Sequence, residues 1–441
     1  MAGGPAPELL PTLTVGARVN WTVPDPFWGA NVRVYYNLGA NQTAAFTSSN
    51  LEFVRWPGGA VADEYNFTSN QIYGPGGATS SPSSNESDFA AWCRSVGCRP
   101  ILQLPGEIDD PATAAYYVHY TVSTLRFHPA YWEIGNEPAL WNHFGIPWAS
   151  WNASQHVNAT PTSYALLVQA YAKAIRAVDP TAQLIGLPGV GTGGYGETAW
   201  ITDTVRLNGP NLSAVGIHVY PAGGATSGTN VSDASFLATL TGSSSLAYRV
   251  PRDRAAIAAA CPRCSNLPLF VTELGSGSLG GPYQSYMAGF DSVPYLAAEI
   301  AQAVQLQVVN VDLFALQGNY NGSILGPTGA PNDVGTLYST MLSALQGGVL
   351  NYTLSAAPPS LYVVPTRNAA GTAYALLAVN VNASVPIRLA IAGTGFPSTN
   401  AGSAWVWTSG LTAPISISWA NGLGPSTIAL APRGVVLIEV A

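Results

Sequence analysis

The sequence predicts a barrel of eight strand and helix units followed by an all-β domain. Short apolar runs of strand length alternate with stretches of helical period from about residue 27 to about residue 350. Two of these runs end in a glutamate that is followed by residues unsuited to a strand. After about residue 350 the helical period disappears, and turn residues recur at intervals of about 8–12 positions. The predicted fold class is therefore α/β, a (β/α)8 TIM barrel with a C-terminal β-sandwich.

Eight apolar segments supply the strands of the predicted barrel. They span residues 30–36, 51–56, 100–104, 131–136, 183–187, 214–219, 268–273 and 309–316. Segments of helical period lie between them at 88–96, 112–126, 162–178, 197–207, 255–260, 293–305 and 335–345, and the first connection, 38–50, is expected to lack a helix. A doubly wound open sheet is the alternative, but it normally has a glycine-rich turn after its first strand. Here the glycine-rich stretch 189–194 follows the fifth strand.

The remaining segments predict the domain organisation. Residues 8–23 alternate apolar and polar side chains, as a half-exposed strand does. We expect residues 1–24 to provide an N-terminal strand that completes the β-sandwich. The barrel is then expected over residues 25–349 and the sandwich over residues 350–441.

Composition limits the class of partner. Charged residues make up 9% of the chain, against roughly 25% in typical soluble proteins. The net charge is −7 and the 16 Lys and Arg residues form no run, which argues against nucleic acid and anionic membranes as partners. No apolar run approaches the ~20 residues of a membrane span. A carbohydrate is the partner that this polar, weakly charged surface favours.

Sequons and cysteines predict a secreted, extracellular protein. Asn-X-Ser/Thr sequons begin at Asn20, Asn41, Asn66, Asn85, Asn152, Asn158, Asn211, Asn230, Asn321, Asn351 and Asn382. The cysteines form two local pairs, Cys93 with Cys98 and Cys261 with Cys264, and we expect each pair to form a disulfide. A zinc site that uses all four thiolates is the alternative, but the pairs lie too far apart for zinc-ribbon spacing. The N-terminus lacks a signal pattern, which a removed signal peptide would explain.

Two glutamates end predicted strands. The stretch Tyr131-Trp132-Glu133-Ile134-Gly135-Asn136-Glu137-Pro138 is an apolar run closed by Glu137, because Pro138 cannot extend a central strand. Residues 268–275 repeat this design with Glu273. The C-terminal ends of all eight strands share one face of a (β/α)8 barrel, so both carboxylates are expected there. The alternative for Glu137 is a helix cap. Glu133, inside the strand, is expected to be a buried carboxylate paired with a barrel donor.

Hydrolysis of a glycosidic bond requires two carboxyl groups at one site, one to attack the anomeric carbon and one to protonate the leaving oxygen. Asn136 is placed to hydrogen-bond a sugar hydroxyl, and His218 and Tyr220 end the sixth strand close to Glu273. An isolated His or Tyr is more often a satisfied core residue, but a position at a strand end favours the site. A carbohydrate-binding protein without catalysis is the alternative from another class, since the 12 Trp and 21 Tyr residues would serve it equally.

Residues 25–350 resemble the clan of retaining (β/α)8-barrel glycoside hydrolases, through Asn136-Glu137-Pro138 and the glutamate that ends the seventh strand. The resemblance implies that Glu137 is the acid/base and Glu273 the nucleophile, with carboxyl groups about 5–5.5 Å apart. Arg55 and Tyr220 are expected to hydrogen-bond Glu273 and keep it ionised. No metal and no cofactor are expected.

Within that clan the sequence is most similar to the heparanase and β-glucuronidase family, glycoside hydrolase family 79. The likeness rests on residues 132–138 and on three further motifs: Val54-Arg55-Trp56-Pro57-Gly58-Gly59, Gly280-Gly281 and Gly318-Asn319-Tyr320. It implies that backbone amides of these glycines and Tyr320 hold a glucuronate carboxylate, and that a polar residue ends the first strand, for which Asn31 is the candidate. Leu279 stands where the family has a tyrosine.

The resemblance predicts a retaining β-D-glucuronidase. Neutral-sugar hydrolases of the same clan are the alternatives: β-xylosidase, β-glucosidase or glucanase, and arabinofuranosidase. Exo cleavage is favoured over endo cleavage because an aromatic cluster could close one end of the cleft. Its members are Trp141, Phe144, Trp148 and Trp151.

Overall fold

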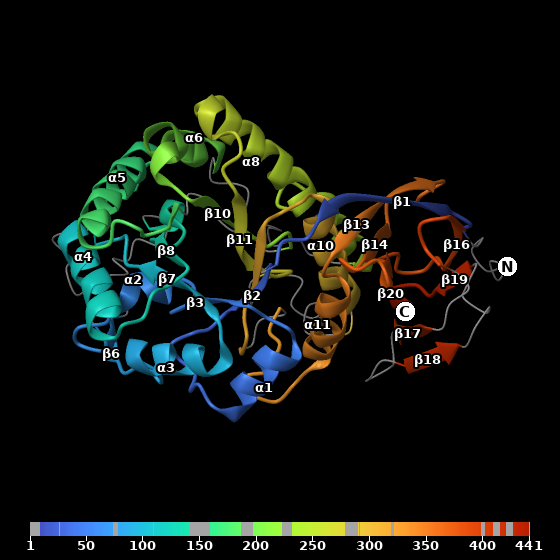
Figure 1. Cartoon of the computed structure of the whole chain (residues 1–441), viewed down its shortest axis with the longest axis horizontal. Coiled ribbons are helices and arrows are strands. Elements are labelled where there is room, and N and C mark those ends of the chain that lie inside the picture. Colours follow the sequence, from blue (N-terminus) through green and yellow to red (C-terminus); the bar gives the residue numbers. More distant parts are fainter. Residues whose placement is uncertain are drawn as a thin grey trace.

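The computed structural model of the chain (Figure 1) contains a closed barrel and a separate β-domain. The structure describes residues 9–25, 27–73, 78–108, 110–141, 159–186, 197–222, 232–277, 290, 292–318, 322–397, 402–408, 415–419 and 427–440.

Eight parallel strands form the barrel, as predicted. They are β2 (Trp28–Asn31), β3 (Phe53–Trp56), β7 (Arg99–Leu104), β8 (Tyr131–Ile134), β9 (Leu184–Gly186), β10 (Ala214–Val219), β11 (Leu269–Leu274) and β12 (Asn310–Leu313). The ring closes in the order β10-β11-β12-β2-β3-β7-β8-β9. Their side chains are almost all buried because helices cover the outside of the ring (Figure 1).

The helices follow the barrel strands along the chain, and the last of them lies between β12 and the β-domain. They are α1 (Ala40–Ser48), α2 (Val61–Glu64), α3 (Glu86–Val96), α4 (Pro111–His119), α5 (Pro161–Val178), α6 (Glu197–Asn208), α7 (Asp233–Ala238), α8 (Leu246–Ala260), α10 (Ser292–Gln305) and α11 (Asp333–Ala344). A small sheet of β4 (Tyr65–Asn66), β5 (Gln71–Tyr73) and β6 (Thr79–Ser80) follows α2. Capping residues explain several helix starts, as at α5, where Thr160 accepts a hydrogen bond from Ser163 N and Pro161 occupies the first turn.

Three sequence-based expectations about elements were wrong. The first connection contains α1, which the weak amphipathic pattern hid but which buries Ala45 and Phe46. The first barrel strand lies at 28–31 and not at 30–36, because Trp28 is part of the buried ring. Helix α8 begins well before the expected 255, since the helix continues through Pro251 with Arg249 and Asp253 buried on it. Tertiary contacts override the local penalty of an internal proline there.

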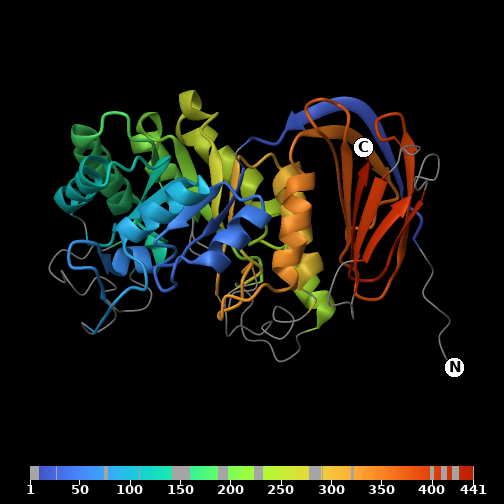
Figure 2. The ribbon, with the colours of Figure 1, turned by 60° about the horizontal axis from the view of Figure 1, so that its bottom comes forward.

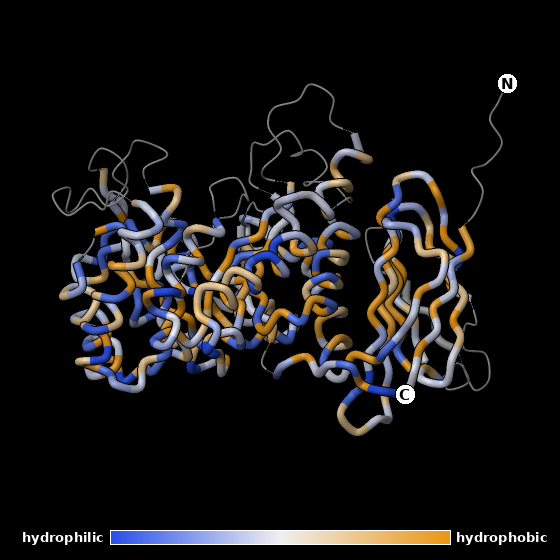
Figure 3. Tube along the Cα trace, turned by 90° about the horizontal axis from the view of Figure 1, so that it is seen from above, coloured by the Kyte–Doolittle hydropathy of each residue, from blue (hydrophilic) through white to orange (hydrophobic). Residues whose placement is uncertain are grey.

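The β-domain is a curled sheet in the order β18-β17-β20-β15-β14-β13-β1-β16-β19. The strands are β1 (Thr12–Thr22), β13 (Gly348–Ser355), β14 (Leu361–Arg367), β15 (Tyr374–Asn380), β16 (Ile387–Gly393), β17 (Gly402–Trp407), β18 (Ile415–Trp419), β19 (Thr427–Leu430) and β20 (Gly434–Val440). The N-terminal strand β1 pairs antiparallel with β13 and parallel with β16, and Figure 2 shows it in blue among the orange and red strands. Alternating apolar residues along these strands (Figure 3), such as Leu376 and Ile438, build a second hydrophobic core.

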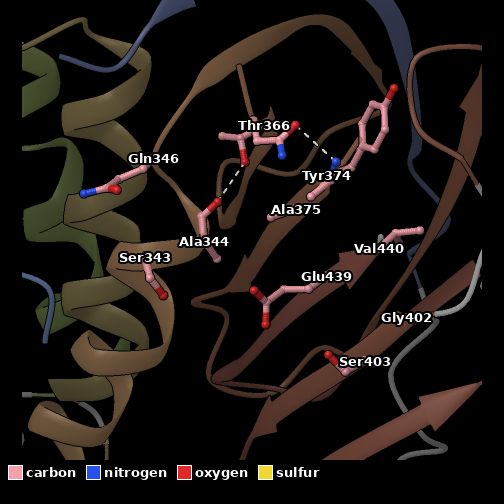
Figure 4. Close-up of a pocket in the computed structure, with 12 residues that line it drawn as sticks. Ser343, Ala344, Gln346, Thr366, Tyr374, Ala375, Gly402, Ser403, Glu439 and Val440 are labelled. Atoms are coloured by element: carbon pink, nitrogen blue, oxygen red, sulfur yellow. Dashed lines mark hydrogen bonds between the residues drawn. The ribbon is translucent and has the colours of Figure 1, made fainter. Parts of the chain in front are cut away.

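Helix α10 packs against β14 and β15 of the β-domain, and helix α11 packs against β15. Between the end of α11 and the sheet lies a cavity of about 510 Å³, with Ser343, Ser403 and Glu439 on its wall (Figure 4). Neither glutamate of the predicted site lines this cavity.

Both cysteine pairs form disulfides, Cys93–Cys98 and Cys261–Cys264, as predicted, and no cysteine is left for a zinc site. Among the described residues, no helix combines the length and the apolar character that a membrane crossing requires.

Candidate active site

Glu273 lies near the C-terminal end of β11, with both carboxylate oxygens held by neighbouring strands. Arg55 Nη1 donates to Oε1 at 2.6 Å, and the Tyr220 hydroxyl donates to Oε2 at 2.5 Å. Glu273 is 4% exposed, so these charge-assisted contacts act with little competition from water. The structure therefore brings together the three side chains that the sequence assigned to this position.

Arg55, at the third position of β3, organises the barrel interior around Glu273. Its buried guanidinium also donates to Glu133 Oε2 at 2.5 Å, Asn31 Oδ1 at 2.8 Å and Asn136 Oδ1 at 2.9 Å. Burial alone would lower the pKa of Arg55, but Glu133 and Glu273 raise it above its ordinary value. Glu133 is the buried, paired carboxylate expected from the sequence. Asn31, at the end of the first strand, is fixed in turn by donating to the carbonyl of Thr272 at 2.8 Å.

Glu137 lies just beyond β8 in an unusual backbone conformation. Its φ is 46° and its ψ is 60°, in the left-handed region, and Gly135 two residues earlier has φ 73°. A Cβ at Gly135 would lie 2.8 Å from the ring of Trp141, so the close approach also requires glycine there. This backbone ends the strand at Ile134, before the expected 136, and turns the Glu137 side chain toward β10. Glu137 precedes the short helical turn Pro138–Leu140, but its side chain makes no capping hydrogen bond to it, so the carboxylate does not serve as the helix cap.

His218 on β10 lies between the two glutamates. Its Nδ1 is 2.9 Å from Glu137 Oε1 and 3.5 Å from Glu273 Oε2. Burial lowers the pKa of His218 to about 3, and the positive charges of Arg55 and Arg249 add to this effect against the attraction of Glu273. The imidazole is therefore neutral at neutral pH. Arg249, buried on α8, donates to the His218 carbonyl and pairs with Glu197, so it fixes this strand end from outside the ring.

One carboxylate oxygen from each of Glu137 and Glu273 and the Nδ1 atom of His218 all lie within 4.8 Å of one another. Two carboxylates and an imidazole are groups that could ligate a metal ion. A cation here would compete with the Arg55 guanidinium and the Tyr220 hydroxyl for Glu273. The hydrogen bond between His218 and Glu137 already accounts for the close approach.

Sequence reasoning missed two side chains and misplaced a third. The first is Asp63 on α2, which accepts hydrogen bonds from the loops that follow β7 and β8. The second is Gln103 on β7, which donates to Asn136 Oδ1 at 3.4 Å and accepts from the amide of Gly58 at 2.9 Å. Trp141, expected in the wall of the cleft, is only 3% exposed and donates to Asp63 and to the Asn136 carbonyl. Its predicted partners Phe144, Trp148 and Trp151 lie outside the described residues.

The residues expected to hold a uronate are described only in part. Gly280, Gly281, Asn319 and Tyr320 lie outside the described residues. The amide of Gly318 donates to the Leu325 carbonyl at 3.1 Å, so it is already used within the chain. Gly59 of the β3 motif has φ 80°, and a Cβ there would lie 3.1 Å from the Phe314 ring and 3.7 Å from Glu273 Oε1. Gly59 thus keeps the space beside Glu273 open.

Comparison by sequence finds no match: no family model matches the chain. No curated protein matches it either. Comparison by structure finds many similar folds. The chain is similar to the GH51 arabinofuranosidase from Xanthomonas axonopodis pv. citri, with a TM-score of 0.78 and 15% identity over 98% of this chain and 100% of that one.

Two other solved structures show the same architecture. An α-L-arabinofuranosidase from Thermotoga maritima has a TM-score of 0.76 and 14% identity over 98% of this chain and 99% of that one. A glycoside hydrolase family 44 xyloglucanase from Paenibacillus polymyxa has a TM-score of 0.73 and 13% identity over 98% and 100%. The Xanthomonas enzyme belongs to family 51 and the Paenibacillus enzyme to family 44, so these neighbours do not support the expected likeness to family 79. At such identities the similarity establishes the fold: a (β/α)8 barrel with a β-domain, as in these glycosidases.

Proposed function

We propose that the chain is a retaining glycoside hydrolase in which Glu273 is the nucleophile and Glu137 the acid/base. The observation that carries the proposal is that carboxylate oxygens of Glu137 and Glu273 lie within 4.8 Å of each other. Retaining enzymes have carboxyl groups about 5–5.5 Å apart, whereas the roughly 6.5–9.5 Å of inverting enzymes leaves room for a water molecule. An oxygen separation of at most 4.8 Å agrees with the shorter, retaining spacing and not with the inverting one.

In the first step Glu273 attacks the anomeric carbon while Glu137 gives its proton to the departing oxygen. The bond from the carbon to the aglycone breaks as the bond to Glu273 forms. Arg55 and Tyr220 aim the Glu273 oxygens by hydrogen-bonding one each. The negative charge of Glu273 in turn favours the proton on Glu137, which is the starting state that the step needs.

In the second step a water molecule replaces the aglycone. Glu137, now ionised, takes a proton from this water, which attacks the anomeric carbon and releases Glu273. His218 contacts both carboxylates through Nδ1 and remains neutral, so it adds no charge that would hold Glu137 ionised. Asn136 Oδ1 is taken by Arg55, so its amide N–H2 is the group available to a sugar hydroxyl.

For the substrate we propose a neutral sugar, with an α-L-arabinofuranoside as the first candidate. The arabinofuranosidases among the structural neighbours support this choice over the glucuronide expected from the sequence. The chemistry of the described site agrees, because the buried Arg55 guanidinium donates four hydrogen bonds to side chains of the barrel and the Gly318 amide donates to Leu325. A uronate carboxylate would need donors beyond these.

A panel of aryl glycosides tests the proposal, with Glu273→Ala as the matched background. The panel contains the 4-nitrophenyl derivatives of α-L-arabinofuranose, β-D-xylose, β-D-glucose and β-D-glucuronic acid. We expect turnover that Glu273→Ala abolishes, fastest on the arabinofuranoside. Faster cleavage of the glucuronide would show that the substrate is a uronide, and it would not contradict the proposed mechanism. Sugar-dependent protection against thermal unfolding with no turnover would instead identify a binding protein.

We also propose that the protein is secreted and glycosylated. The two local disulfides support an oxidising compartment. Among the described residues, four sequon asparagines are exposed: Asn20, Asn41, Asn211 and Asn351. Expression through a eukaryotic secretory route, followed by treatment with peptide N-glycosidase, should lower the apparent mass. An unchanged mass would contradict glycosylation.

A further inference from the structure

We propose that Asp63 is a positioning residue for Glu137: its buried carboxylate fixes the backbone that aims the proton donor. Asp63 lies on α2, just after the β3 motif, and it is 2% exposed. Asp63 does not contact the reacting atoms. It acts on Glu137 indirectly, by holding the loop after β8. The role rests on the proposed function, because it assigns Glu137 as the acid/base.

One carboxylate accepts four hydrogen bonds from two separate loops. Oδ1 accepts from the backbone amides of Gly106 at 2.7 Å and Glu107 at 3.3 Å. Oδ2 accepts from the backbone amide of Asn136 at 3.1 Å and from Nε1 of Trp141 at 3.2 Å. The strands that precede these segments, β3, β7 and β8, are neighbours in the barrel. Asp63 therefore ties together three adjacent strand ends at the rim where Glu137 lies.

The Glu137 backbone depends on such external contacts. Residue 137 adopts a left-handed conformation that only glycine adopts without cost, so surrounding contacts must hold it. The amide of Asn136 donates to Asp63, and the Asn136 carbonyl accepts from Trp141 Nε1 at 2.8 Å. Because the same Trp141 nitrogen also donates to Asp63, the peptide groups on both sides of Asn136 are held by Asp63, one directly and one through Trp141.

The chemistry of the position calls for an aspartate. All four neighbours are N–H donors, and both oxygens of an aspartate carboxylate can accept. Burial raises the pKa of Asp63 to about 7, while its four hydrogen bonds favour the ionised, accepting form. Asparagine would turn an N–H2 group toward two of these donors. Alanine would remove the carboxylate that all four buried N–H groups donate to. Glu64, the next residue, makes a matched comparison. It is also buried, but its hydrogen bond goes to the Tyr35 hydroxyl at 3.4 Å and not to the loop after β8.

Leaving-group dependence separates positioning of Glu137 from a general loss of structure. A misaimed proton donor slows cleavage of poor leaving groups and spares good ones, because a 2,4-dinitrophenolate departs without a proton. For Asp63→Asn we expect kcat/KM to fall about 10–100-fold on a phenyl or alkyl glycoside and less than about 3-fold on the 2,4-dinitrophenyl glycoside. Glu64→Gln should leave both values unchanged. Thermal unfolding of each variant is measured in parallel.

Equal losses on both substrates, or a lower Tm with unchanged leaving-group dependence, would overturn the role. If Asp63→Asn does not fold, Trp141→Phe removes one of the four donors and should shift the leaving-group dependence in the same direction by a smaller factor. An unchanged dependence in that variant would count against the proposal too. Absence of turnover that depends on Glu273 in the unmodified protein would instead overturn the proposed function, and the positioning role with it.

Discussion

Inside the barrel, Nη1 of Arg55 lies 2.6 Å from Oε1 of Glu273. The same planar guanidinium reaches Glu133, Asn31 and Asn136, a set of acceptors that a lysine ammonium on a single stem cannot span. We expect Arg55→Lys to lower kcat by about 100-fold or more and to lower the free energy of unfolding by about 3–5 kcal/mol, because Glu133 would remain buried without its partner. Steady-state kinetics and urea unfolding measure the two effects.

The control for this variant is Arg206→Lys. Arg206 is largely exposed and pairs with Asp203 at 2.7 Å on the surface of α6. Surface ion pairs contribute about 0–1 kcal/mol, so this change should alter neither kcat nor stability measurably. A similarly small effect of Arg55→Lys would show that the interior network does not organise Glu273.

Local pattern explains why much of this site was predictable. The strand that leads to Glu137 is marked by its apolar run and by Pro138, and the strand of Glu273 is marked by its apolar run and by the Gly275 that follows. In a closed barrel such strand ends converge, so the family resemblance at Arg55 and the strand-end position of Tyr220 were enough to assign both to Glu273.

The features that could not be predicted depend on contacts between distant segments. Asp63 stands in a short acidic stretch, and its four donors come from residues 106–141, which only the folded chain brings to it. Helix α8 runs through Pro251 because Arg249 on it meets Glu197 and the His218 carbonyl, and α1 forms because packing buries Phe46. The sequence could not decide the sugar for the same reason: glycine motifs indicate close backbone approach but not which ligand approaches.

Tyr220→Phe removes a single hydroxyl from the site. The ring should keep its place against Phe314, with centroids 6.3 Å apart, while Glu273 Oε2 loses its 2.5 Å donor. We expect kcat to fall roughly 10–100-fold with little change in Tm. Tyr116→Phe, at a residue that is 55% exposed, is the matched control and should be neutral. Full activity of Tyr220→Phe would contradict a role for this hydroxyl in aiming Glu273.

Glu137→Ala should leave the attack by Glu273 intact and remove the proton donor. We expect a loss of several orders of magnitude on poor leaving groups and a much smaller loss on 2,4-dinitrophenyl glycosides. Azide should restore turnover of the activated substrate and yield a glycosyl azide with the anomeric configuration of the substrate. Product analysis by NMR checks this. Equal losses on all leaving groups, with no rescue, would argue against Glu137 as the acid/base.

Stability should depend on pH through Glu86, a buried carboxyl on α3 far in the sequence from the two glutamates. Burial raises the pKa of Glu86 to about 8, against a small opposing effect of the Thr121 hydroxyl. The folded state therefore holds a proton that the unfolded state releases above about pH 4.5, so the free energy of unfolding falls as pH rises from about 4.5 to 8. Glu86→Gln should remove this pH-dependent loss of stability, and its side-chain carbonyl can still accept the hydrogen bond from Thr121.

We expect Glu86→Gln to raise Tm at pH 8 by about 2 °C or more and to change it little at pH 5. Scanning calorimetry at the two pH values measures the difference, with pH 5 as the internal reference. A variant that is equally destabilised at both pH values would show that Glu86 is not protonated in the folded protein.

The central claim is that Glu273 forms a covalent bond to the sugar. The most direct test is mass spectrometry of the Glu137→Ala variant after incubation with 2,4-dinitrophenyl glycosides of the four sugars in the panel, because loss of the acid/base slows release of the intermediate more than its formation. The account predicts a mass increase of one glycosyl residue, located on the peptide that contains Glu273 and absent when Glu273 is also changed to Ala. Turnover without any adduct, giving a product of inverted configuration, would contradict it.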